Sequence, residues 1–153
     1  MSVRSRLLPA LAGALLALGG IAAWTVHARG GATTDVWGIR LGDSLSMTRD
    51  HFRAPAGGTW TSSAAPEPVL AWAPAAGTPS PVSSARFEFH DGMLVAARLE
   101  LRPDADAARG PGLELGRSSV IAREPSAEGT RITLISRDCP EHAAEVRRLL
   151  ARP

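Results

Sequence analysis

The chain has 153 residues, with 17 basic side chains, 15 acidic side chains and one cysteine. All the basic residues are arginines, and from Arg29 onward 15 arginines balance 15 acidic residues. A near-neutral domain without a basic run excludes the electrostatic footprint of nucleic-acid binding. A single cysteine excludes an internal disulfide framework, a four-cysteine zinc site and a heme attachment motif.

The first 28 residues have the features of a targeting segment. Arg4 and Arg6 precede 20 uncharged residues, 7–26, and small or β-branched residues at 26–28 or 21–23 suit a signal peptidase. The apolar span is also long enough to cross a bilayer. A cleaved signal peptide and an uncleaved signal anchor therefore both remain open. Either one places the following domain outside the cytoplasm, as a periplasmic, secreted or inner-membrane-anchored protein.

Residues 29–35 are predicted to be a polar linker, and 36–153 a single α+β domain, because about 125 residues suffice for only one compact core. Residues 36–41 alternate loosely, as in a short strand. Ser44 is a candidate N-cap of a helix that reaches Phe52.

Two short strands are predicted next, at 59–63 and 67–73. Prolines inside and around this region restrict any pairing to the edges of a sheet.

The clearest local pattern is a β-hairpin over residues 85–101, around Asp91-Gly92. A three-residue loop that begins at His90 pairs Phe87 with Val95 and puts the large apolar side chains on one face, so this register is predicted in preference to a two-residue loop. The opposite face is expected to be solvated; it carries Arg86, Glu88, Arg98 and Glu100.

The C-terminal part is predicted to contain a loop at 103–116, strands at 118–123 and 130–137, and a final helix. Asp138 and Glu141 have the spacing of a capping box at the start of that helix. Its buried side is expected to consist of Ala143, Val146, Leu149 and Leu150. The predicted fold is a small antiparallel sheet with one helix near its N-terminal side and one C-terminal helix, both gathered on one face.

Two segments, 39–52 and 87–95, resemble small bacterial envelope proteins of the SmpA/OmlA type, which have a β-lactamase-inhibitor-like fold. The first has an apolar-x-x-Gly-x-Ser pattern where a strand leads into a helix, and the second is a hairpin. The resemblance implies an envelope-located interaction or scaffold domain, and it transfers no catalytic residues.

Cys139 and His142 form the one constellation of reactive groups close together in the sequence. A thiol at a helix N-terminus beside an imidazole suits a redox or nucleophilic cysteine, or half of a metal site. Asp138 and Glu141 oppose a thiolate, and a simply buried cysteine is the favoured interpretation. A metal site would need His27, His51 or His90, which are expected to be ordinary surface histidines, so neither a metal nor a cofactor is predicted.

Trp37, Trp60 and Trp72 could line a small-ligand groove, but a core position is the favoured interpretation. The function predicted from the sequence is therefore a non-enzymatic, exported or membrane-tethered envelope domain that binds a protein or another envelope component. The alternatives are a thiol-dependent or redox protein that uses Cys139 and His142, and a small-ligand binder lined by the tryptophans.

Overall fold

The computed structural model describes residues 36–53, 57–63, 67–103, 105 and 111–151. The predicted targeting segment, the linker and His27 lie outside these ranges. Within them, no helix combines the length and apolar character needed to span a membrane.

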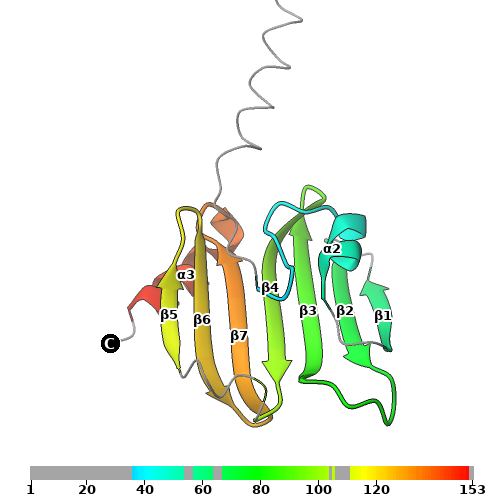
Figure 1. The fold of residues 1–153 in the computed structure, drawn as a ribbon. Helices are drawn as coiled ribbons and strands as arrows, with labels where there is room; N and C mark the ends of the chain where they lie inside the picture. The colour runs from blue at the N-terminus through cyan, green and yellow to red at the C-terminus, as the bar shows by residue number, and fades with distance from the viewer. Residues whose placement is uncertain (1–35, 54–56, 64–66, 104, 106–110, 152–153) are drawn as a thin grey trace, which may run out of the picture. The chain divides into compact units, whose positions relative to one another are not determined.

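A seven-stranded antiparallel sheet dominates the described residues (Figure 1). Four strands follow one another as a meander, three more form a second meander, and the last of these pairs with β4 to give the order β1-β2-β3-β4-β7-β6-β5. The strands are β1 (Gly58–Ser63), β2 (Val69–Pro74), β3 (Val82–His90), β4 (Met93–Leu101), β5 (Gly112–Leu115), β6 (Ser119–Ser126) and β7 (Gly129–Ser136).

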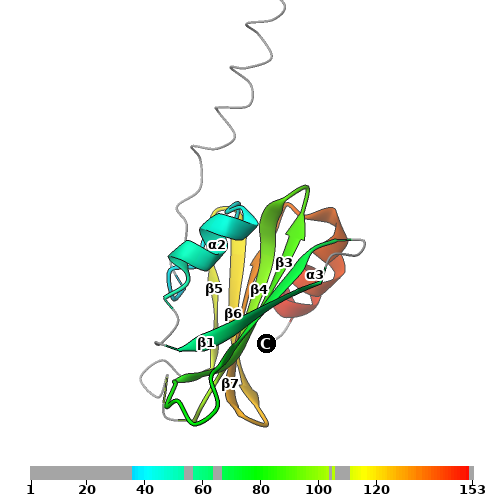
Figure 2. The same ribbon diagram turned by 90° about the vertical axis from the view of Figure 1, so that its right-hand side faces the viewer.

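Two α-helices lie on opposite faces of this sheet, α2 (Leu45–His51) and α3 (Ala143–Leu150), the latter preceded by the 3-10 helix η2 (Pro140–His142) (Figure 2). We call the two sides the α2 face and the α3 face. The prediction of an antiparallel sheet with one helix on the N-terminal side and one at the C-terminus is confirmed. The prediction that both helices share one face is wrong, because β4, β6 and β7 bury apolar side chains on both faces. Ala96 and Ala97, for example, are consecutive and both fully buried.

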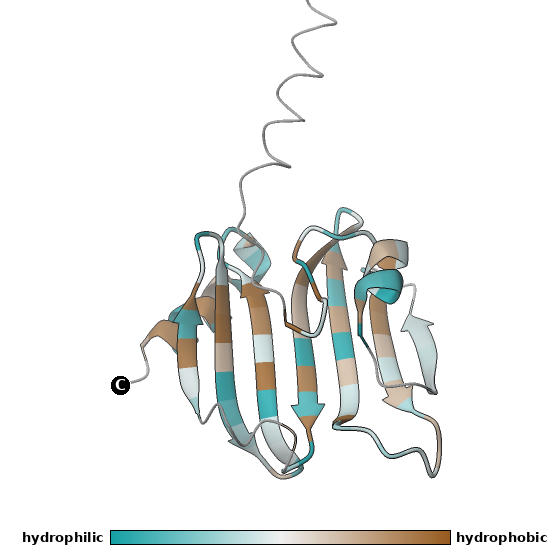
Figure 3. Ribbon diagram, in the orientation of Figure 1, coloured by the Kyte–Doolittle hydropathy of each residue, from teal (hydrophilic) through white to brown (hydrophobic). Residues whose placement is uncertain are grey.

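The main core lies on the α2 face. Phe52, which caps α2, packs edge-on against Trp60, Trp72 and Phe87 with ring centroids 5.3 to 5.7 Å apart. Hydrophobic and hydrophilic residues alternate along β3 and β4, as the bands in Figure 3 show. A smaller apolar cluster lies on the α3 face; it consists of Ala96, Val120, Ala122, Ile135, Val146 and Leu149.

The β3–β4 hairpin has a different register from the predicted one. A two-residue turn, with Asp91 at φ 49° and Gly92 at φ 75°, pairs His90 with Met93. A bulge at Val95 then shifts the pairing, so that Phe87 faces Ala97. The predicted three-residue loop is wrong because the bulge, inside the strand, absorbs the extra residue.

The predicted helix at 44–52 is confirmed, with the Ser44 side chain accepting a hydrogen bond from the Met47 N–H. The four further predicted strands are confirmed as β1, β2, β6 and β7, with ends shifted by a few residues. Residues 36–41 are instead a tight turn, in which Val36 and Ile39 form a single bridge. The predicted loop at 103–116 contains a strand, β5.

The start of the last helix also differs from the prediction. Cys139 occupies the N-cap of η2 without a side-chain cap, so the capping box of Asp138 and Glu141 does not form. Leu150, predicted to be buried, is 39% exposed. The Glu141 side chain contacts His90 instead, and this contact belongs to the site described next.

Candidate functional site

Side chains from two distant parts of the chain meet near one end of the α3 face. Arg86, Glu88 and His90 alternate along β3, so all three point to this face. Cys139 and His142 come from the segment that leads into α3. The tight η2 turn brings residues three apart nearly above each other, which places Cys139 beside His142.

The centre of the site is a thiol between two imidazoles. The Sγ of Cys139 lies 3.3 Å from Nδ1 of His90 and 3.3 Å from Nδ1 of His142. The two rings have centroids 5.3 Å apart. Cys139 is 6% exposed and His142 is 8% exposed, whereas the His90 side chain is 15% exposed. We call these three residues the thiol–imidazole cluster.

Carboxylates hold the outer nitrogen of both rings. Nε2 of His142 lies 3.0 Å from Glu88, and Nε2 of His90 lies 2.7 Å from Glu67 and 3.0 Å from Glu141. Both imidazoles are therefore arranged alike, with Nδ1 toward the sulfur and Nε2 toward a carboxylate.

Glu88 connects the cluster to a network of ion pairs under α3. Its carboxylate receives hydrogen bonds from Arg98 at 2.6 Å and Arg86 at 3.1 Å. Burial alone would raise the pKa of Glu88, but the His142 hydrogen bond and the charges of Arg98 and Arg86 outweigh it and lower the pKa below 4.5. Arg98 also reaches Glu145 of α3 at 2.6 Å. The prediction that this face is solvated is therefore wrong for Glu88, Arg98 and Glu100, whose side chains are 18–26% exposed.

The cluster has too few hydrogens to make both of its sulfur–nitrogen contacts hydrogen bonds. If each Nε2 donates its hydrogen to a carboxylate, each Nδ1 presents a lone pair to the sulfur. The Cys139 thiol has one proton and can donate to only one of these nitrogens. The other contact becomes favourable when an added proton converts that imidazole to an imidazolium, which donates to the sulfur, or when a metal ion accepts all three donors.

The donor atoms suit a metal ion in both type and spacing. The three atoms lie within 4.8 Å of one another. Tetrahedral zinc, with Zn–N near 2.05 Å and Zn–S near 2.3 Å, needs nitrogen and sulfur about 3.6 Å apart. The observed 3.3 Å separations would have to open by only a few tenths of an ångström.

Sequence reasoning found two members of this cluster and missed the third. The proximity of Cys139 and His142 that their spacing predicts is confirmed. The interpretation of His90 as an ordinary surface histidine in a loop is wrong, because His90 ends β3 and points toward the thiol. The available signal was the alternation in β3, which puts His90 on the same face as Glu88. His51 lies elsewhere, paired with Asp43 at 2.7 Å.

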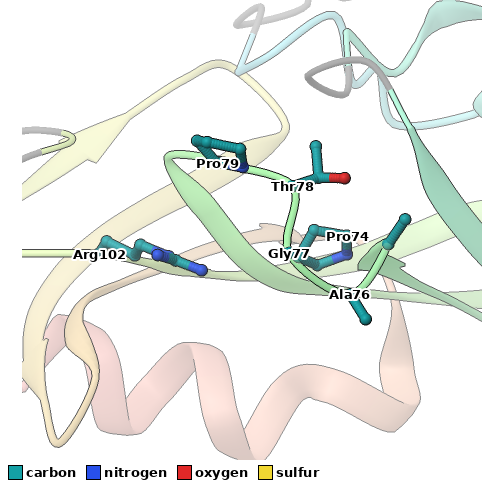
Figure 4. Close-up of a pocket in the computed structure, with 7 residues that line it drawn as sticks. Pro74, Ala76, Gly77, Thr78, Pro79 and Arg102 are labelled. Carbon is teal, nitrogen blue, oxygen red and sulfur yellow. The ribbon is translucent and has the colours of Figure 1, made fainter.

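The three tryptophans take part in the packing of the α2 face. Trp72 is buried in the core of the α2 face, and Trp37 and Trp60 pack against that core. A hollow of about 370 Å³ lies beside the β2–β3 loop, where Pro74, Pro79 and Arg102 contribute to its lining (Figure 4). Its lining includes no tryptophan and no member of the thiol–imidazole cluster.

Comparison of the chain with family models, with curated proteins and with solved structures found no match.

Proposed function

We propose that this chain is an exported, non-enzymatic domain that binds a thiophilic divalent metal ion, Zn²⁺ foremost, through His90, Cys139 and His142. One observation carries the proposal: both Nδ1 atoms lie 3.3 Å from the same thiol while both Nε2 atoms face carboxylates. Metal-bound histidines in proteins use this arrangement, because the outer carboxylate fixes the ring and strengthens the inner nitrogen as a ligand.

The charge around the cluster supports a cation. Four carboxylates lie in or around it, and among the described residues three guanidinium groups pair with them, so one negative charge is in excess before the thiol ionises. A bound divalent ion offsets this excess and favours the thiolate. The charged groups are Glu67, Glu88, Glu141, Glu145, Arg86, Arg98 and Arg148.

A structural or ion-carrying role fits the site better than catalysis. Three protein ligands leave one position of a tetrahedral ion for water, as in catalytic zinc sites, but Cys139 and His142 are buried, so a substrate has little access to that position. The cluster is largely buried under the segment that leads into α3, and an ion there would tie that segment to β3. The ion would thus stabilise the C-terminal part of the domain.

The proposed location rests on the N-terminal sequence. Two arginines followed by the apolar span 7–26 support export, with the domain outside the cytoplasm. There it would act in the cell envelope, in contact with the membrane through the N-terminal segment and with a protein or another envelope component as partner. The resemblance to SmpA/OmlA-type proteins stays a prediction that agrees with this location.

A second candidate function is thiol chemistry at Cys139. The 3.3 Å contact of its sulfur with His142 favours it, because an imidazolium beside a thiol stabilises the thiolate. Against it, the thiol is 6% exposed and the chain has no second cysteine to resolve a disulfide.

The decisive experiment is a titration of the reduced, metal-free full chain with Co²⁺ as a spectroscopic substitute for Zn²⁺. We expect thiolate-to-cobalt charge transfer and intense tetrahedral d–d bands, which one equivalent of Zn²⁺ removes. Cys139→Ser should abolish the charge transfer, and His142→Ala should weaken binding at least ~10-fold. His51→Ala is the matched control, because His51 also pairs with a carboxylate but lies outside the cluster.

Absence of charge transfer in the wild-type chain would reject the proposal. If the wild-type thiol also reacts rapidly with a thiol reagent at neutral pH, and His142→Ala slows this reaction, the second candidate function replaces the first. Slow labelling that Zn²⁺ slows further supports the metal site.

A further inference from the structure

We propose a second cation site on the outer side of His90, formed by Nε2 of His90 with Glu67 and Glu141. It takes a divalent first-row ion such as Zn²⁺, and the His90 ring bridges it to the ion in the thiol–imidazole cluster. This inference rests on the proposed function, because the second site shares the His90 ring with the ion in the thiol–imidazole cluster.

Two carboxylates from unrelated segments converge on one ring nitrogen. Glu67 lies just before β2 and Glu141 lies in η2, and their oxygens lie 2.7 Å and 3.0 Å from Nε2 of His90. All three atoms lie within 4.8 Å of one another. A single N–H donates one good hydrogen bond, so the ring can satisfy only one of the two carboxylates.

His142 serves as a comparison, because its outer carboxylate only orients the ring. It faces one carboxylate, Glu88, and the charge of Glu88 is offset by Arg98 and Arg86. His90 faces two carboxylates, and among the described residues neither forms an ion pair with an arginine. The excess negative charge is therefore concentrated on the outer side of His90.

The geometry allows a cation to replace the hydrogen of Nε2. A tetrahedral zinc ion with nitrogen and oxygen ligands near 2.0–2.2 Å needs donors about 3.4 Å apart. The carboxylates would have to move outward by several tenths of an ångström. Their side chains are 44% and 58% exposed, which leaves them room to move and gives the ion access from solvent. Water completes the coordination, and the donor set of one nitrogen and two carboxylates suits a harder ion than the thiolate site.

The two sites are linked through the ring. A ring that binds one ion at each nitrogen has no hydrogen on either nitrogen, so the second ion must replace the hydrogen of Nε2. When the second ion binds, the Nε2 proton is released to solvent and the ring bridges the ions as imidazolate. With metal–nitrogen bonds of 2.0–2.1 Å on both sides, the ions would lie about 6 Å apart.

The test is the Zn²⁺ stoichiometry of the full chain at saturating metal, by native mass spectrometry after gel filtration, with proton release measured in parallel. We expect two ions per wild-type chain and one per Glu67→Gln/Glu141→Gln chain, which should release one proton fewer. The same variant titrated with Co²⁺ should keep its thiolate charge transfer. Saturation is needed, because loss of outer carboxylates can also weaken the first ion by about 10–100-fold. Glu114→Gln/Glu128→Gln is the matched control: both side chains are exposed, as those of Glu67 and Glu141 are, but they lie outside the two proposed sites, so this chain should keep two ions.

The outcomes separate the two proposals. One ion in both the wild type and the Glu67→Gln/Glu141→Gln chain overturns the second site and leaves the proposed function intact. Two ions in that variant also overturn it, since the second ion then binds elsewhere. No ion in the wild-type chain overturns the proposed function, and the second site with it.

Discussion

The two faces of the sheet are each covered by a helix, yet they are built differently. On the α2 face, Phe52 brings three other aromatic rings together in a continuous apolar core. On the α3 face, the apolar cluster is small and contains two alanines, Ala96 and Ala122. The rest of the contact there is made by ion pairs and by the thiol–imidazole cluster.

This difference separates stability from function. Large apolar side chains contribute most of the free energy of folding, and the α2 face holds most of them. Burial of apolar surface contributes less free energy of folding on the α3 face. The ion pairs there offset only part of the free energy needed to desolvate the charges. A metal ion would therefore add most to the stability of the domain on the α3 face, where the apolar contact is weakest.

The largest expected effect comes from removing an aromatic side chain from the α2 face. Phe87→Ala should lower the free energy of unfolding by about 3–5 kcal/mol, because the ring is fully buried and leaves a cavity. Leu149→Ala on the α3 face should cost only about 2 kcal/mol, near the lower end for buried leucines, because the surrounding side chains are small. Chemical denaturation of the metal-free chain measures both. Equal costs, or a larger cost for Leu149, would contradict the contrast between the faces.

Zinc should stabilise the chain through the α3 face alone. At a free Zn²⁺ concentration 100 times the dissociation constant, the wild-type chain should gain about 2.7 kcal/mol of unfolding free energy. Phe87→Ala should gain the same increment, since the two faces act independently. Cys139→Ser should gain much less at that concentration. A smaller gain in Phe87→Ala than in the wild type would mean that the faces are coupled.

The ion pairs under α3 should have an intermediate effect. Arg98→Ala should cost about 2 kcal/mol, because it removes a partner from two half-buried carboxylates, Glu88 and Glu145. Arg148→Ala is the control: Arg148 also pairs with Glu145, but its side chain is 62% exposed and Glu145 keeps Arg98 as a partner, so the loss should be about 0.2–1 kcal/mol. Denaturation in low and high salt checks the assignment, since salt screens the exposed pair more strongly. Similar losses for both variants would show that α3 does not shield the network.

Local sequence signals predicted most of the elements but not their arrangement. The Ser44 cap and the alternating strands are set by neighbours in the chain, and both were predicted correctly. The bulge at Val95 and the pairing of β7 with β4 depend on contacts between distant segments. The placement of α3 opposite α2 follows from β4, β6 and β7 being apolar on both faces, which a search for simple alternation overlooks.

In the candidate site, too, only the contact between residues close in the sequence was predicted. Cys139 and His142 are three residues apart, so their contact could be predicted from spacing. His90 is 49 residues from Cys139 and joins them only because η2 crosses the end of β3. Glu141 was assigned to a helix cap because its spacing suits one, but the structure uses it as a partner of His90. A polar row on one strand face, together with reactive groups before a helix, is the pattern that could have predicted the cluster.

The smallest expected effect concerns Glu88, which joins the cluster to the arginines. Glu88→Gln should cost about 1 kcal/mol at pH 7, because it keeps an acceptor for His142 but loses the charge that Arg98 and Arg86 stabilise. The pKa of Glu88 in the folded chain lies below its ordinary value of 4.5. Its charge therefore adds stability above the unfolded-state pKa, and this stability is lost as the pH falls through the folded pKa. Urea denaturation of the metal-free wild type and Glu88→Gln should give curves that converge as the pH falls below 4.5. A difference that stays constant over this range would mean that the cost of the substitution does not come from the charge of Glu88.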